Sequence, residues 1–418
     1  MGRRTKPVEN KQDLRWLGVW IKLERLKRNW SQEGLCHGLC AVSYLSKIEQ
    51  GKVPAPNPDL MRLLCKRLDG AWEDDPAVLA PLESRVEEMY DAFLDADFGR
   101  FWALHKGLME HWEEYLHSPF LLDALILGYE SEEDKVRLSE AELTLLKEME
   151  PVFSHRQRTV CKISAGRATE LLDKDPSSRD YLGAGIEYYQ SGAYTRSVEL
   201  LQTAFQMGAA EGRVCIMLLA RVFSGNCYAN LQDYPQMTAH YRVAEKIARA
   251  VGDLEEVETI RYNIAATALD LGRAEEAYAY FHAACGEEKP AETLSIMALH
   301  KLARCCEALG KTEEALSALD RAERAKAVYP EREFALEICG LVRYRLTHEG
   351  YIHDPVYGEK LTRCFERMER ELPPGFAGSH IPYMLAWYTE NRMYKDAYQL
   401  LFRFPGYKSP PVHPPVSL

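Results

Sequence analysis

Apolar residues recur at three- and four-residue spacings along most of the chain, which predicts helices rather than strands. Within the first seventy residues, one such stripe runs over 17–26, a second over 35–48 and a third over 60–68. The segment 53–58 holds three prolines, and because proline cannot continue a helix, it predicts a stiff loop. We expect a compact bundle whose core takes up seven apolar side chains: Leu17, Ile21, Leu45, Ile48, Leu60, Leu63 and Leu64.

Two short helices are predicted between residues 31 and 51. Ser31 is a favourable N-cap, so the first helix can begin there, and Gly51 supplies the stop expected past the end of the second. Leu45 and Ile48, three residues apart, turn one face of the second helix inward. The opposite face carries small polar and cationic side chains, which suit docking in the DNA major groove: Ser43, Ser46, Lys47 and Gln50.

This motif has Ser-Gln-Glu at 31–33, Tyr-Leu-Ser-Lys-Ile-Glu at 44–49 and Gly-Lys at 51–52, and it resembles the lambda-repressor-like (XRE/Cro type) helix-turn-helix family. The turn at 38–42 looks one residue shorter than the commonest form. The resemblance implies double-stranded DNA as a partner, with Gln32 at a phosphate. The residues expected to contact DNA are Gln32, Val42, Ser43, Ser46 and Lys47. The alternative is a plain helical bundle with a solvated polar face.

Charge separates this N-terminal part from the remainder. Residues 1–70 carry 14 Lys and Arg against 7 Asp and Glu, a net charge of +7. The whole chain has a net charge of −11, so residues 71–418 carry −18. A basic module is the electrostatic footprint of phosphate binding, whereas the acidic remainder would repel DNA and favours a sensing or assembly role.

A single pattern recurs four times between residues 178 and 325, at spacings of 40, 40 and 38 residues. Each copy has a small residue, then a Gly or polar residue that turns the chain, then a Leu or aromatic residue that fills the gap between helices. The small-residue column comprises Gly185, Gly225, Ala265 and Ala303, with a weaker copy at Leu385 and another near Ala96. Such helix pairs cannot bury their apolar faces alone, so they must stack. The pattern resembles the tetratricopeptide repeat in its longer form of about forty residues.

The combination of this helix-turn-helix with long tetratricopeptide repeats resembles the RRNPP family of bacterial peptide-pheromone receptors. Residues 244–253 (Ala-Glu-Lys-Ile-Ala-Arg-Ala-Val-Gly-Asp) and 261–266 (Arg-Tyr-Asn-Ile-Ala-Ala), leading into Leu271-Gly272, look much like repeats of that family. The resemblance implies a cytoplasmic transcription regulator that forms a homodimer and binds a short signalling peptide in a concave groove. Some members act on response-regulator proteins instead, and the intact helix-turn-helix argues against that branch.

We therefore expect an all-α fold, in which an N-terminal lambda-repressor-like helix-turn-helix bundle is followed by a tetratricopeptide-repeat right-handed α-solenoid. The predicted boundaries are 11–70 for the helix-turn-helix domain, 71–82 for a linker, 83–405 for the ligand-binding and dimerisation repeats, and 406–418 for a Pro-rich tail. Two other function classes stay open: an adaptor whose repeats bind a folded protein, and a regulator of the response-regulator phosphatase type.

The repeat columns also predict which residues face a ligand, since the first helix of each pair lines the inner surface of a stacked array. The predicted groove residues are Tyr189, Gln190, Asn226, Asn230, Tyr262, Asn263, His300, Lys301 and Arg304. An Asn amide offers both a donor and an acceptor, so it can pair with a peptide backbone whatever its side chains. Lys301 or Arg304 can take a terminal or acidic carboxylate. The alternative is that all nine are ordinary solvated or inter-helix polar residues.

Large apolar side chains in the fifth copy predict a homodimer surface, because the end of a solenoid would otherwise face water. They are Tyr383, Met384, Trp387, Tyr388, Tyr394, Tyr398, Leu401 and Phe402. The alternative is that these residues pack inward against the fourth copy and the tail, which would leave a monomer.

The remaining chemistry favours no enzyme and no cofactor. Eleven cysteines are spread without Cys-x-x-Cys pairs, which is the usage of a reduced cytosolic protein. Cys36-His37-x-x-Cys40 has ligand-type residues, but we expect both thiols to pack inside the bundle rather than to bind zinc. The chain has no catalytic motif and no apolar run of membrane-spanning length, so we predict no catalytic site, no metal site and no membrane partner.

Overall fold

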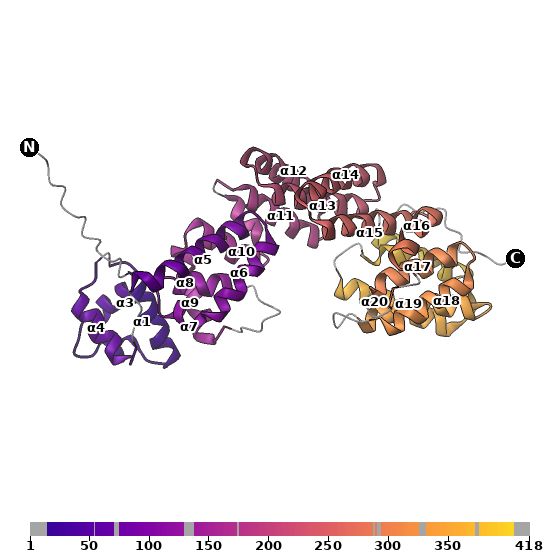
Figure 1. Ribbon diagram of the computed structural model, residues 1–418. Helices are drawn as coiled ribbons and strands as arrows, with labels where there is room; N and C mark the ends of the chain where they lie inside the picture. The colour runs from indigo at the N-terminus through magenta and orange to yellow at the C-terminus, as the bar shows by residue number, and fades with distance from the viewer. Residues whose placement is uncertain are drawn as a thin grey trace, which may run out of the picture. The chain divides into compact units, whose positions relative to one another are not determined.

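The computed structural model contains only helices as regular elements in the part of the chain that it describes (Figure 1). The described residues are 15–53, 55–70, 75–128, 138–173, 175–286, 289–290, 294–325, 332–372 and 376–404. The chain divides into two compact units, Met1–Asp180 (unit 1) and Tyr181–Leu418 (unit 2). The all-α prediction is confirmed. Among the described residues, no helix combines the length and apolar character needed to span a membrane.

Unit 1 begins with four helices, which we call the head: α1 (Arg15–Lys27), α2 (Gln32–Cys36), α3 (Val42–Glu49) and α4 (Pro58–Arg67). The predicted start and stop signals are confirmed. The Ser31 hydroxyl accepts a hydrogen bond from the Gly34 N–H at the start of α2, and Gly51 takes φ +64° just past the end of α3. A left-handed residue at that point is unstrained only for glycine, so α3 ends there.

The core of the head follows the predicted stripes except at one position. Leu17, Ile21, Leu45 and Ile48 are buried, but Leu63 is 50 % exposed, so its assignment to the core was wrong. Helix α4 instead buries Met61, Leu64 and Cys65. Successive residues of a helix are about 100° apart, so a face centred on positions 61, 64 and 65 turns position 63 toward solvent.

The buried apolar side chains of the head and of the rest of unit 1 form one connected hydrophobic core. Its members range in sequence from Leu17 to Val160. Helix α1 packs against α8 and α9, and Lys22 of α1 forms a 2.6 Å ion pair with Glu148 of α9. The segment predicted as a linker, 71–82, is helical from Pro76 onward. The helices after the head are α5 (Pro76–Leu94), α6 (Phe98–Glu110), α7 (Trp112–Leu116), α8 (Leu121–Gly128), α9 (Glu140–Met149) and α10 (His155–Ser164), with 3₁₀ turns at Glu150–Val152 and Ala168–Asp173.

Unit 2 begins within α11 and continues as helices that pack on their neighbours along the chain. They are α11 (Ser178–Gln190), α12 (Tyr194–Glu211), α13 (Val214–Asn230), α14 (Tyr234–Val251), α15 (Leu254–Asp270), α16 (Ala274–Ala284), α17 (Ile296–Ala308), α18 (Thr312–Arg324), α19 (Arg332–Thr347), α20 (Pro355–Glu371), α21 (Ile381–Glu390) and α22 (Tyr394–Arg403). Two 3₁₀ segments, η4 (Tyr351–His353) and η5 (Phe376–His380), precede α20 and α21.

The repeat columns have the physical roles that their composition predicts. At Gly225, an added Cβ would lie 2.5 Å from the ring of Tyr241, so only glycine lets α13 and α14 approach this closely. The gap-filling column is buried throughout the four copies, at Leu201, Tyr241, Phe281 and Leu319. The turn column takes positive φ in every copy, including the fifth, at Gly192, Gln232, Gly272, Gly310 and Arg392.

The fifth copy differs from the other four. Leu400 is buried in place of Leu401, which is 42 % exposed. Met384, predicted for a dimer surface, is buried inside unit 2, whereas Tyr394, Tyr398 and Phe402 on α22 are exposed. The predicted tail at 406–418 lies outside the described residues.

Candidate functional site

The outward face of α3 carries four of the five residues predicted to contact DNA. Val42, Ser43 and Lys47 are exposed, while Leu45 and Ile48 on the opposite face are buried. Ser46 is half-buried and its hydroxyl accepts a hydrogen bond from the Gln50 amide at 3.1 Å. The short helix therefore presents a polar face of the kind that can enter a major groove.

Gln32, the fifth of these residues, lies at the start of α2 and takes part in a buried network. Its side-chain amide donates to Glu49 Oε2 at 2.8 Å. Arg25 of α1 binds the same carboxylate through Nε at 2.7 Å and Nη2 at 2.9 Å, and its Nη1 donates to the Trp30 carbonyl. Glu49, only 1 % exposed, thus ties the end of α3 to both α1 and α2. The sequence carried one sign of this network, because Arg25 continues the apolar stripe of α1 four residues after Ile21.

The candidate zinc ligands lie in the head. Cys36 is buried in its core, and burial raises the pKa of the Cys40 thiol. No group of three His, Cys, Asp or Glu side chains within the described ranges is placed to hold a metal ion.

Unit 2 contains a cavity of about 1020 Å³, which we call the unit 2 cavity. The first helices of successive pairs, α11, α13, α15 and α17, supply much of its wall, and α19, η5 and α21 supply more. Eight of the nine predicted groove residues line it: Tyr189, Asn226, Asn230, Tyr262, Asn263, His300, Lys301 and Arg304. Gln190 does not line the cavity and is exposed.

One part of this wall is built from asparagines and tyrosines. The Tyr241 hydroxyl, buried beneath them, donates to Asn226 Oδ1 at 2.5 Å. The Asn230 amide donates to the Asn226 carbonyl at 2.9 Å. Burial raises the pKa of the Tyr189 hydroxyl, so it remains a neutral hydrogen-bonding group at neutral pH. This wall offers amides and hydroxyls beside aromatic surface, which suits a backbone with mixed side chains.

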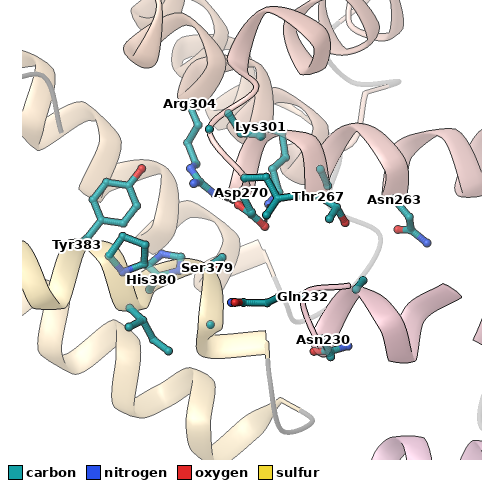
Figure 2. Close-up of a pocket in the computed structure, with 18 of the residues that line it drawn as sticks. Asn230, Gln232, Asn263, Thr267, Asp270, Lys301, Arg304, Ser379, His380 and Tyr383 are labelled. Carbon is teal, nitrogen blue, oxygen red and sulfur yellow. Dashed lines mark hydrogen bonds and ion pairs between the residues drawn. The ribbon is translucent and has the colours of Figure 1, made fainter. Parts of the chain in front are cut away.

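A second part of the wall is charged. Asp270, the last residue of α15, accepts from Arg304 Nη1 at 2.9 Å and lies 3.7 Å from Lys301 Nζ (Figure 2). Arg345 of α19 binds Glu307 of α17 with both branches of its guanidinium, at 2.5 and 2.7 Å. Although burial by itself raises the pKa of Asp270, the two cations beside it hold that pKa below its usual range.

Two histidines complete this charged part. His380 of η5 and His300 of α17 are both buried. Burial, with Arg304 and Arg345 nearby, lowers the pKa of His380 to about 3. Burial also lowers the pKa of His300 well below its ordinary value, with Arg304 as the next cause. Both rings are therefore neutral near pH 7 and act as hydrogen-bonding groups rather than charges.

Comparison with known proteins agrees with this geometry. The helix-turn-helix family model matches residues 21–73, which contain most of α1 and all of α2 to α4. The predicted helix-turn-helix motif, including α3 with its outward polar face, lies inside the matched segment. A search of curated proteins found no match to the chain.

Two solved structures share the fold of most of the chain. A Rap protein complexed with competence and sporulation factor is 16 % identical, with a TM-score of 0.58, covering 78 % of this chain and 97 % of its own. The apo form of the quorum sensor NprR from B. thuringiensis is 12 % identical, with a TM-score of 0.52, covering 78 % of this chain and 98 % of its own. The predicted resemblance to peptide-pheromone receptors is thus confirmed at the level of the fold.

Sequence reasoning missed several residues of the unit 2 cavity. The sequence did contain a signal for Asp270. Asn263, Thr267 and Asp270 are spaced four and three residues apart, so Asp270 shares one face of α15 with the predicted groove residue Asn263. His380 and Tyr383 had none, because they lie outside the four clear copies of the repeat.

Proposed function

We propose that this protein is a DNA-binding transcription regulator that senses a short peptide in the unit 2 cavity. The observation that carries the proposal is a cavity of about 1020 Å³, walled by asparagines and cations, in the same chain as a helix-turn-helix domain. This volume reaches the upper end of the range for small-molecule sites, which suits an extended peptide. Eleven free cysteines support a reducing, cytoplasmic setting, and the proposed role is regulatory rather than enzymatic.

On the DNA side, Ser43, Ser46 and Lys47 project from α3 toward base edges, and Val42 supplies an apolar contact beside them. Gln32 donates one amide hydrogen to Glu49 and has the other for a phosphate at the start of α2. Its role is therefore partly to orient α3. The net charge of +7 on residues 1–70 supports binding to phosphates.

The DNA proposal is tested by selecting bound fragments from sheared genomic DNA and measuring gel shifts with them. Lys47→Ala should weaken binding by about 1–3 kcal/mol and relax the sequence preference, if Lys47 reads a base. Arg196→Ala is the matched control, because Arg196 is an exposed cation on α12 in unit 2. Equal affinity and an unchanged preference for Lys47→Ala would overturn the assignment of the α3 face.

On the ligand side, Asn263 and Asn230 are the amides best placed to pair with a peptide backbone. Losing one such pair costs about 1–3 kcal/mol when its partner stays buried. Asn226 is a poorer probe, because its Oδ1 already accepts a hydrogen bond from the buried Tyr241 hydroxyl.

The ligand proposal is tested by retaining peptides from a randomised hexapeptide library and measuring their affinity by calorimetry. Asn263→Ala should reduce that affinity by about tenfold or more, consistent with the loss of one buried pair. Gln190→Ala is the control. The repeat columns predict Gln190 as a groove residue as well, but its side chain lies outside the cavity. If both variants bind like the wild type, the cavity is not the peptide site.

We also propose a homodimer, because two heads are needed to read a two-fold DNA site with useful specificity. Support comes from α22, where Tyr394, Tyr398, Leu401 and Phe402 share one face and are all exposed. Light scattering on Tyr398→Glu combined with Phe402→Glu should give a monomer where the wild type gives a dimer. A wild-type monomer at high concentration with DNA present would refute the dimer, and a dimeric double variant would exclude α22.

A further inference from the structure

At its charged end, the unit 2 cavity holds a carboxylate of the protein between two cations. Asp270 is only half-buried, whereas the side chains of Lys301 and Arg304 are 11 % and 9 % exposed. The anion is therefore the member of the group that solvent reaches, and the cations lie beneath it. Asp270 also ends α15, where the helix dipole disfavours a negative charge, so the two cations rather than its own helix hold it there.

The cations of this cluster outnumber its carboxylates. Lys301, Arg304 and Arg345 face Asp270 and Glu307, and Arg345 is fully engaged with Glu307 through two hydrogen bonds. Lys301 and Arg304 therefore share the single negative charge of Asp270, which leaves one positive charge uncompensated. His300 and His380 are neutral at neutral pH and add no further charge. A surplus buried charge is costly unless an anion compensates it.

Polar atoms that can donate hydrogen bonds are also unused in the same wall. Arg304 Nε and His300 Nδ1 are buried, and neither has a hydrogen-bond partner within the described part of the chain. His300 is 2 % exposed, and its ring lines the cavity beside Lys301 and Arg304. Buried polar atoms of this kind are normally paired, so their presence around a charged surplus indicates a place for an additional acceptor.

We infer that Lys301, Arg304 and His300 form a subsite for a carboxylate of the ligand, and that Asp270 occupies this subsite as an internal substitute until the ligand arrives. The inference rests on the proposed peptide-sensing function and specifies the chemistry that the cavity selects. The ligand carboxylate displaces Asp270 from Arg304 and brings a further acceptor to the unused donors. Asp270 therefore competes with the ligand, and a peptide without a carboxylate at this end gains nothing from the cations.

The test uses the full chain and three pools of hexapeptides whose randomised positions exclude Asp and Glu. One pool ends in a free carboxylate, the second ends in a carboxamide, and the third ends in a carboxamide but carries one Glu. We expect the free-acid pool to bind at least tenfold more tightly than the plain amide pool. If the Glu-bearing pool shows that gain instead, the subsite takes an acidic side chain rather than a C-terminus.

Two variants test the competition. Asp270→Asn should raise the affinity for the carboxylate-bearing pool severalfold and leave the plain amide pool unchanged. Arg304→Gln should erase the difference between the pools. Glu245→Gln is the matched control, because Glu245, like Asp270, pairs with two cations, here Arg249 and Arg261, but lies outside the cavity.

If Asp270→Asn fails to fold, Lys301→Gln replaces it and should reduce the preference for a carboxylate. Equal binding of all three pools would overturn the subsite while leaving peptide sensing intact. Binding of none of the pools would overturn the proposed function, and the subsite with it.

Discussion

Replacing Glu49 with Leu should destabilise unit 1 by about 3–5 kcal/mol, the usual cost of leaving one member of a buried ion pair alone. The structure supplies the reasons. Glu49 is almost fully buried and accepts two hydrogen bonds from Arg25 and one from Gln32. Its removal leaves the guanidinium of Arg25, which is itself buried, with only the Trp30 carbonyl.

The measurement is urea unfolding of the full chain followed by tryptophan fluorescence. Six of the seven tryptophans belong to unit 1, so the signal reports mainly on that unit: Trp16, Trp20, Trp30, Trp72, Trp102 and Trp112. With a urea dependence of about 2 kcal/mol/M, the midpoint should fall by about 1.5–2.5 M. Since the head shares its core with the rest of unit 1, we expect one shifted transition rather than separate loss of the head.

Two further variants show whether the ion pair is the cause. Arg25→Met combined with Glu49→Leu should recover most of the stability, because an apolar pair of similar size avoids burying a lone charge. Asp59→Asn, which removes a solvent-exposed pair with Arg62, should change nothing measurable. A Glu49→Leu variant within about 1 kcal/mol of wild type, or a double variant as unstable as the single one, would refute the reasoning.

Two other predictions concern unit 2, whose one tryptophan, Trp387, reports its unfolding. Gly225→Ala should lower the free energy of unfolding by about 1–3 kcal/mol, because the new methyl group would meet the ring of Tyr241 at 2.5 Å. Gly340→Ala meets nothing within 4 Å and should stabilise slightly, and an equal loss in both variants would contradict the packing argument. His380, with its pKa lowered from 6.5 to about 3 by burial and nearby arginines, takes up its proton more readily when unfolded. Below pH 6.5, His380 should therefore lower stability by about 1.4 kcal/mol per pH unit, in addition to the loss from His300, whose pKa is also lowered. Replacing His380 with Gln should remove its share of that slope in urea unfolding from pH 7 to pH 4.5, and an unchanged slope would exclude this histidine as a cause.

The sequence alone determined the features that depend on residues close together in the chain. The Ser31 cap, the glycine that ends α3 and the positive φ of the turn column at Gly192, Gly272 and Gly310 follow from local backbone preferences. The repeat spacing likewise predicted the small residue at Gly225 and the ring that fills the gap beside it. Helical periodicity was sufficient to place eight of nine groove residues on one cavity wall, because it specifies which side chains share a face.

The tertiary structure decided which helices pack against each face of a given helix. Periodicity left Leu63 on an apolar stripe, but the orientation of α4 in the head turns it outward. The pairing of Arg25 with Glu49 joins residues 24 positions apart, and that of Arg345 with Glu307 joins residues 38 apart. Such pairs depend on how helices meet, so no local pattern predicts them. The same holds for His380, which no repeat column contains and which η5 brings to the cavity wall beside Arg304. Packing of distant helices, rather than their individual sequences, therefore decided the charge at the end of the cavity.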